Sequence, residues 1–229
     1  MKTAILMMLL SGLSALGGQV PTASEIANRM MEREQARQSS LGVYTWMSHY
    51  TLDNKERHAE MMVQWTREGD GTKHYAIAYE RGDGAVREHV FQKLLESEVE
   101  ASQPGLQSRN RLNDKNYAFR WSGSEEIKGR AAYILDVEPK TESKFLIKGR
   151  VWIDAADYAV VKVEGSPAKK PSFWTNAVSF VQTFEKAGDY WMAASNRSVT
   201  EAKLFGEADL AIKHSNYRFG PTATMMASN

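Results

Sequence analysis

The sequence predicts an α+β protein built on one curved antiparallel sheet, an unclosed β-barrel of about ten strands with two main helices covering its apolar concave face. About ten segments alternate between apolar and polar residues at intervals of about 10 to 15 residues, whereas two segments show helical spacing. Ten flat strands would span ~48 Å, and a helix of about 16 residues is only ~24 Å long. The sheet must therefore curl, and we expect an apolar cavity beneath the helices.

The composition excludes several classes of protein. The 229 residues are 42% hydrophobic and 25% charged, which excludes a disordered or collagen-like chain. The absence of cysteine excludes disulfides, thiolate metal sites, thiol catalysis and a lipid-modified cysteine anchor. With 29 basic and 28 acidic residues, the chain lacks the positive charge typical of a nucleic-acid binder, so we expect no nucleic-acid partner.

The N-terminal segment predicts a secretory signal peptide. Lys2 precedes an uncharged apolar stretch, residues 3–16, and the small residues Ala15 and Gly17 suit cleavage after residue 17. A membrane anchor is the alternative, but about 15 apolar residues fall short of the ~20 needed to cross a bilayer. We therefore expect residues 1–17 to be a signal peptide, residues 18–229 to form one domain, and the mature protein to lie in a bacterial periplasm or outside the cell.

The first half of the domain is predicted to form a helix, a three-stranded meander and a second helix. Thr22 and Glu25 form a capping box, which predicts a helix over residues 23–38. Turns rich in Gly and Asp then separate three alternating strands, which predicts an antiparallel meander. The three strands are expected over residues 43–52, 58–66 and 75–79.

A second helix and a long series of strands follow. Apolar residues at helical spacing predict a helix over residues 86–102, closed by Pro104-Gly105, and the polar stretch 107–115 predicts a mobile loop. A further loop is expected at residues 166–172. Strands are expected over residues 117–121, 132–138, 145–154, 158–164, 178–184, 190–203 and 210–219.

Catalytic and metal-binding motifs are missing from the sequence. There is no His-Glu-x-x-His, Gly-x-Ser-x-Gly or P-loop pattern. Ser166 and Lys169 match Ser-x-x-Lys in spacing, but the neighbouring prolines predict a loop rather than the helix start that the motif requires. His58 and Glu60 share a strand face, which suits either part of a metal site or a solvated face. We expect no catalytic residues, no metal and no cofactor.

The types of apolar residue say more about function than these missing motifs do. Removal of residues 1–17 leaves 8 of the 11 methionines and all 6 tryptophans, many of them on alternating strand faces. Methionine is flexible and frequent on surfaces that accept varied apolar ligands. Apolar stripes of this kind also form ordinary cores, so each single residue is open to both interpretations.

The segment Gly149-Arg-Val-Trp-Ile-Asp154 with Tyr158-Ala-Val-Val-Lys-Val-Glu-Gly165 resembles a strand–turn–strand pair of the LolA-like family of outer-membrane lipoprotein-sorting proteins. Tyr190-Trp191, Leu204-Phe205-Gly206 and the segment from Leu210 to Phe219 are similar too, and the order of signal peptide, long helix, meander and helical insert also agrees. Met192-Ala193 departs from the family, in which many members carry a proline soon after the tryptophan. The resemblance implies an unclosed barrel whose helices cover a hydrophobic cavity for acyl chains, in a carrier without a lipid anchor.

The expected lipid-binding residues lie on one face of the predicted strands, with a helical lid around Phe91, Leu94 and Leu95. A register slip of one residue would invert each strand, so the choice of face is itself a prediction. The strand residues are Tyr44, Trp46, Met61, Val63, Trp65, Tyr75, Ile77, Tyr133, Leu135, Val151 and Ile153.

The predicted function is a non-enzymatic periplasmic carrier or chaperone. It would bind lipoprotein acyl chains or lipid, and meet transient protein partners at the inner and outer membranes. The alternative is a regulatory protein that senses a lipid or lipoprotein and contacts a membrane partner. A lipid hydrolase is a third class, disfavoured because the sequence assembles no nucleophile and base.

Overall fold

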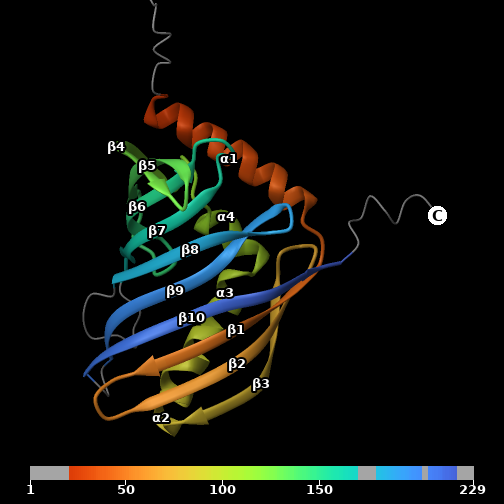
Figure 1. Cartoon of the computed structure of the whole chain (residues 1–229), viewed down its shortest axis with the longest axis vertical. Helices are drawn as coiled ribbons and strands as arrows, with labels where there is room; N and C mark the ends of the chain where they lie inside the picture. The colour runs from red at the N-terminus through yellow and green to blue at the C-terminus, as the bar shows by residue number, and fades with distance from the viewer. Residues whose placement is uncertain (1–20, 170–178, 203–205, 221–229) are drawn as a thin grey trace, which may run out of the picture.

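A computed structural model describes residues 21–169, 179–202 and 206–220 of the chain. The predicted signal peptide, residues 1–17, lies outside the described residues, as do Val178 and residues 170–172 of the predicted loop. The described strands form one ten-stranded antiparallel sheet in the order β3-β2-β1-β10-β9-β8-β7-β6-β5-β4. The sheet is curved and unclosed, with β3 and β4 at its two edges (Figure 1). The predicted fold class is confirmed.

The strands follow the alternating segments of the sequence closely. Most predicted strand centres are confirmed, and the differences lie at the ends. Tyr158 has a positive φ of 52° in the turn before β7, so that strand begins later than expected. The strands are β1 Tyr44–Asp53, β2 His58–Arg67, β3 Lys73–Gly82, β4 Tyr117–Ile127, β5 Arg130–Pro139, β6 Ile147–Asp154, β7 Val160–Pro167, β8 Ser179–Ala187, β9 Tyr190–Ala202 and β10 Gly206–Phe219.

Helix α1, Ala23–Ser40, begins at the predicted capping box. The side chain of Thr22 accepts from the backbone N–H of Glu25, and the Glu25 carboxylate accepts from the backbone N–H of Thr22. The helix buries Ile26 and Met30 against the sheet. Figure 1 shows α1 crossing the end of the molecule where β4 to β7 lie.

The second predicted helix is a composite segment. It consists of α2, Gly84–Val86, a π-helical turn η1, Arg87–Phe91, and α3, Gln92–Ala101. The segment begins earlier than expected because Asp83 caps it, accepting a 2.9 Å hydrogen bond from the backbone N–H of Val86. We call this composite segment the cover, because it lies over the β1–β3 end of the sheet.

The predicted loop at residues 107–115 is wrong in its first part. The chain forms a short helix α4, Pro104–Asn110, there. Pro104 does not close the preceding segment but occupies the first turn of α4, where its fixed φ favours a helix start. The Gln107 side chain then donates to the carbonyl oxygens of Asp70 and Ser102, at 3.0 and 2.6 Å, and ties α4 to the β2–β3 turn.

Three apolar clusters form the core of the described residues. The first, here the β1–β3 cluster, joins β1, β2 and β10 to the cover. The second, the α1 cluster, joins α1 to β4–β7. A third, the outer cluster of Ala132, Ile134, Trp152 and Val161, lies on the opposite face of β5–β7. Two clusters therefore share the helix-covered face, here the inner face, and one lies outside it.

Candidate functional site

The inner face is continuous across the sheet. In the register, Phe180 faces Ser198, Ser198 faces Leu210 and Leu210 faces Leu52. Directly paired residues of adjacent strands point to the same side of a sheet. This row therefore links the α1 cluster, which Phe180 contacts, to the β1–β3 cluster, which contains Leu52 and Leu210.

All the strand residues predicted to bind lipid lie on this inner face, but they fall into two groups. Trp46 faces Trp65 in the β1–β3 cluster and Trp65 faces the exposed Tyr75 of β3, whereas Tyr133 faces Ile153 on β5 and β6. The first group is Tyr44, Trp46, Met61, Val63, Trp65, Tyr75 and Ile77, with Phe91, Leu94 and Leu95 from the cover. The second group, in the α1 cluster, is Tyr133, Leu135, Val151 and Ile153.

The cover fills the inner face at the β1–β3 end. Phe91 and Leu95 are fully buried, and Met61 and Trp65 beneath them are each 1% exposed. This corrects the expectation of an open cavity beneath the helices, because helix side chains occupy the space there. Tyr75 and Ile77 are exposed instead, since β3 is an edge strand.

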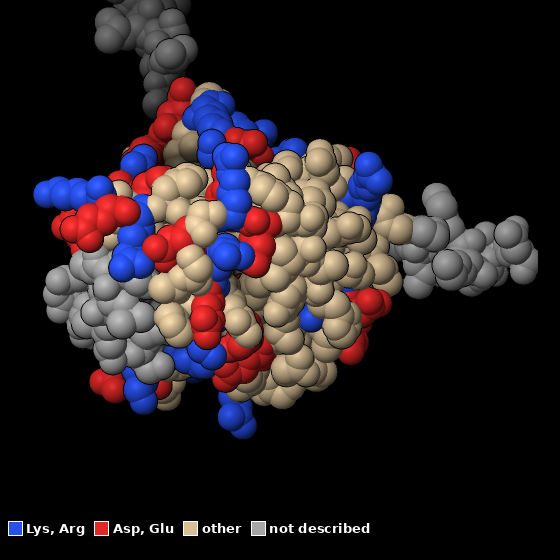
Figure 2. Space-filling model, turned by 90° about the horizontal axis from the view of Figure 1, so that it is seen from below, with Lys and Arg blue, Asp and Glu red and all other residues tan. Residues whose placement is uncertain are grey.

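Figure 2 views the molecule from the end where α2 and β3 lie. It shows a broad surface without charged side chains beside an area in which acidic and basic side chains alternate. On β3 itself, Tyr75, Ile77 and Tyr79 are all large and exposed. At this end of the sheet, large uncharged side chains are therefore exposed to solvent as well as buried in the core.

Between the two clusters lies a strip of half-buried rings and apolar side chains, here the central strip, on β8 and β10. Phe180 and Phe184 contact the α1 cluster, and Ile212 and Tyr217 contact the β1–β3 cluster. The Tyr217 hydroxyl donates a 2.7 Å hydrogen bond to the carbonyl oxygen of Ala193, which fixes its ring. The central strip was not among the predicted site residues, although the alternation of β8 and β10 was visible in the sequence.

An ion pair ties the cover to β3 at the margin of the β1–β3 cluster. Lys73 of β3 pairs with Glu98 of α3, and its ammonium group lies 5.9 Å from the centre of the Trp46 ring. Burial opposes the charge on Lys73, but the carboxylate of Glu98 outweighs it and raises the Lys73 pKa. Lys73 in turn holds the pKa of Glu98 below its ordinary value. Both groups are therefore charged at neutral pH.

A second polar contact lies within the inner face. The Ser48 hydroxyl and His214 Nδ1 are 2.8 Å apart and bridge β1 and β10. Burial, opposed by Glu98 and reinforced by Lys73, lowers the His214 pKa to about 4, so the ring is neutral at pH 7. Ser48 is fully buried, which withholds its hydroxyl from a substrate, so the pair is a structural bridge rather than a nucleophile and base.

The two sequence patterns with catalytic or metal-binding spacing lead to no site. Ser166 lies within β7. The backbone N–H of Lys169 donates to the Ser143 carbonyl oxygen, and neither residue lies at the start of a described helix, as the motif would require. His58 contacts Asp53 rather than Glu60. Within the described ranges, no three His, Cys, Asp or Glu side chains are placed to hold a metal ion. The helices in those ranges are also too short or too polar to cross a membrane.

The outer cluster was not predicted as a site either. Trp152 is 2% exposed, with the Lys162 ammonium 4.0 Å and the Arg150 guanidinium 5.3 Å from its ring centre. In the sequence, the alternation of Trp152 with Val151 and Ile153 indicated that Trp152 lies on the opposite face of the strand from these two residues. We assign this cluster to packing of the outer face, where the two cations shield a large ring from water.

The fold and the inner face define the class of protein: an open antiparallel sheet, covered on one side by helices, whose inner face carries two apolar clusters with Ser198 and Asn196 of β9 between them. No family model and no curated protein sequence match the chain. Solved structures do. A LolA superfamily protein from Nitrosomonas europaea aligns with a TM-score of 0.47 and 9% identity, over 92% of this chain and 99% of that chain.

Two further structures resemble this chain. A DUF1329 family protein from Desulfovibrio piger has a TM-score of 0.46 and 15% identity, over 87% of this chain and 94% of that one. A putative outer membrane lipoprotein-sorting protein domain from Vibrio parahaemolyticus has a TM-score of 0.46 and 14% identity, over 88% and 96%. LolA superfamily and lipoprotein-sorting proteins are thus among the solved structures to which this chain is similar.

Proposed function

We propose that the protein binds the acyl chains of lipids or lipoproteins on its inner face and carries them through the periplasm toward the outer membrane, without catalysing a reaction. The observation that carries this proposal is the continuity of the inner face. The β1–β3 cluster, the half-buried central strip and the α1 cluster share this face, on which Ser198 and Asn196 of β9 lie between the apolar side chains of β8 and β10. A long hydrocarbon chain needs such an elongated apolar surface and no charge chemistry.

Burial of hydrocarbon supplies the affinity. Each methylene group removed from water contributes about 0.8 kcal/mol, so even part of an acyl chain outweighs the loss of a few solvent contacts. The rings of Phe180 and Phe184 are half-buried in the described structure and offer a first contact. A chain laid along the central strip would reach both clusters.

Full burial requires the cover to move. The cover buries Val86, Val90, Phe91 and Leu95 in the β1–β3 cluster. It also forms two ion pairs with β3, Arg87–Glu80 and Lys73–Glu98. A π-helical turn interrupts its regular hydrogen bonding, and such turns occur frequently at functional sites. A bound chain would replace the cover's own side chains on Met61, Val63 and Trp65, so the two states bury similar apolar area.

The signal peptide predicted at residues 1–17 provides the route to the periplasm. Transfer also needs a donor at the inner membrane and an acceptor at the outer membrane. Each would act by binding the open or the closed cover preferentially, since a partner shifts a conformational equilibrium only by its differential affinity. These transient protein partners are part of the proposal.

The test is the binding of a fluorescent fatty acid to the mature protein. We expect saturable binding by the wild type and weaker binding by Leu94→Asp, which places a carboxylate on the half-buried face of the cover. Val181→Asp is the matched control, because Val181 is 37% exposed and neighbours Phe180 on the opposite face of β8. Absence of saturable binding by the folded wild type, checked by circular dichroism, would eliminate the carrier proposal.

A further inference from the structure

A pocket of about 490 Å³ lies outside the inner-face clusters, between the second half of α1 and the β8–β9 hairpin. It is separate from the predicted lipid-binding residues, none of which lines it. Its polar and aromatic lining comes from α1, the β6–β7 turn and the hairpin. Its cations are Arg33, Arg37 and Lys186, its carboxylates are Asp157 and Asp189, and its aromatic rings are Tyr190 and Trp191.

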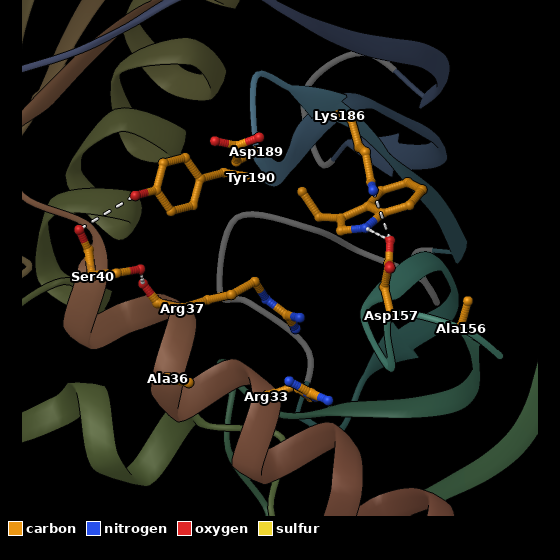
Figure 3. A pocket seen from close by; sticks show the side chains of 10 residues that line it. Arg33, Ala36, Arg37, Ser40, Ala156, Asp157, Lys186, Asp189 and Tyr190 are labelled. Carbon is orange, nitrogen blue, oxygen red and sulfur yellow. Dashed lines mark hydrogen bonds and ion pairs between the residues drawn. The ribbon is translucent and has the colours of Figure 1, made fainter.

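Positive groups converge on this pocket. Figure 3 shows Arg33 and Arg37 extending from α1 into the pocket, with Lys186 facing them from the strand side. Arg37 is held by Glu34 of its own helix, at 2.9 Å, and its side chain is 18% exposed. Arg33 makes no hydrogen bond or ion pair with any residue of the described chain. Asp189 also lines the pocket, but Figure 3 shows its carboxylate apart from the two guanidinium groups.

Asp157, the other acidic residue of the lining, is already occupied. It pairs with Lys186 at 2.9 Å and Arg130 at 3.1 Å, and it accepts a 2.9 Å hydrogen bond from the Trp191 ring nitrogen. The hydrogen bond from Lys186, followed by that from Trp191, lowers the pKa of Asp157. Its carboxylate therefore fixes the position of Lys186 and leaves the positive charge of Arg33 uncompensated.

The geometry points to a phosphate-binding site in this pocket. Guanidinium groups bind phosphate oxygens in pairs of parallel hydrogen bonds, and an ammonium group adds a point charge. Arg33 and Arg37 are one helical turn apart, and Glu34 offsets the charge of Arg37 but not that of Arg33, which favours an anion beside Arg33. A phosphate group placed between α1 and Lys186 would contact all three cations.

An apolar path leads away from the pocket, which favours a phosphate carried by a lipid. Ring contacts with centroid distances of 4.9 to 5.7 Å connect the rim residue Tyr190 to the β1–β3 cluster. This aromatic row consists of Tyr190, Phe219, Tyr44, Trp46, Trp65 and Tyr75. A headgroup phosphate in the pocket would direct its hydrocarbon chain along the aromatic row toward the inner face. This choice of source rests on the proposed lipid-binding function, whereas the phosphate site itself does not.

The test compares three probes by calorimetry: inorganic phosphate, a long-chain alkyl phosphate and an uncharged monoacylglycerol. The variant is Arg33→Gln/Arg37→Gln. The matched control is Arg81→Gln/Arg120→Gln, which removes the same charge from side chains that are 67% and 83% exposed on the edge strands. Thermal unfolding of each variant verifies that it is folded.

We expect the pocket variant to bind both phosphate probes about tenfold or more weakly, equivalent to about 1.4 kcal/mol, and the control to bind them like the wild type. Tighter binding of the alkyl phosphate than of inorganic phosphate by the wild type supports a lipid source, and equal binding supports free phosphate as the ligand. Unchanged phosphate binding by the folded pocket variant, or no phosphate binding by the wild type, overturns the inference. Monoacylglycerol binding tests the proposed function separately, because that probe carries no phosphate.

Discussion

The neutral, half-buried His214 makes stability depend on pH in a way that can be calculated. Its pKa is lowered from 6.5 to about 4 in the folded protein, so the unfolded chain binds more protons between these values. The contribution of His214 to the free energy of unfolding is therefore fully present above pH 6.5 and is lost as the pH decreases toward 4. The whole difference corresponds to about 3.4 kcal/mol, of which about 2 kcal/mol is lost between pH 7 and pH 5.

The surroundings of His214 support assigning this loss to it. Ser48 on β1, Glu98 on α3 and Lys73 on β3 are the polar and charged groups that act on the ring. Because the Glu98 pKa is lowered and the Lys73 pKa is raised, neither group changes charge between pH 5 and pH 7. The titration of this region over that range therefore belongs to His214.

Urea unfolding at pH 7 and pH 5, for the wild type and His214→Asn, measures the effect. Asparagine keeps a polar group near Ser48 but does not titrate. We expect the variant to lose about 2 kcal/mol less than the wild type between the two pH values. The four other histidines of the sequence are common to both proteins and cancel in the comparison. Parallel pH profiles of the two proteins would refute a neutral, half-buried His214.

Three further predictions concern stability. Phe91→Ala should lower the free energy of unfolding by about 3–5 kcal/mol in a denaturant titration, because the fully buried ring joins the cover to the sheet; no change would show that the cover is not packed. Gly149→Ala should lower it by about 1–3 kcal/mol, since a Cβ there would lie 2.1 Å from the Glu164 carbonyl oxygen, whereas Gly105→Ala meets no atom within 4 Å and should not destabilise. Thr22→Ala should cost about 1 kcal/mol through loss of the helix cap, detected as a lower melting temperature; an unchanged melting temperature would argue against the capping box.

The strands were predictable because their pattern is local. Alternation in β1 and β2 placed Trp46 and Trp65 on one face, and the register confirms that they face each other. The capping box at Thr22 fixed the start of α1 in the same way. Each of these features depends on residues within a few positions of one another, which a sequence displays directly.

The helical segments after β3 were less predictable. The π-helical turn η1 covers only five residues, too few for a change of apolar spacing to show in the sequence, so the sequence could not distinguish η1 from its neighbours. Pro104 suits both the end of one helix and the first turn of the next. Only the tertiary contacts of Gln107 with Asp70 and Ser102 show which role it takes.

The candidate sites also combine features that local sequence predicts with features that depend on distant segments. The face that carries Met61 and Val63 followed from alternation, but the filling of that face by Phe91 did not, since it depends on packing between distant segments. The phosphate pocket joins Arg33 to Lys186, which lie far apart in the chain. Arginines one turn apart on a helix are common, so their convergence on Lys186 was visible only in the structure.

Native mass spectrometry of the mature protein, titrated with a long-chain fatty acid, tests the proposed carrier function most directly. If the cover opens over the apolar clusters of the inner face, the mass of the protein increases by that of a bound fatty acid and the bound fraction saturates, with Leu94→Asp showing a smaller bound fraction at each concentration. A folded wild-type protein that keeps the mass of the bare chain at excess fatty acid would show that the inner face is only a packed core.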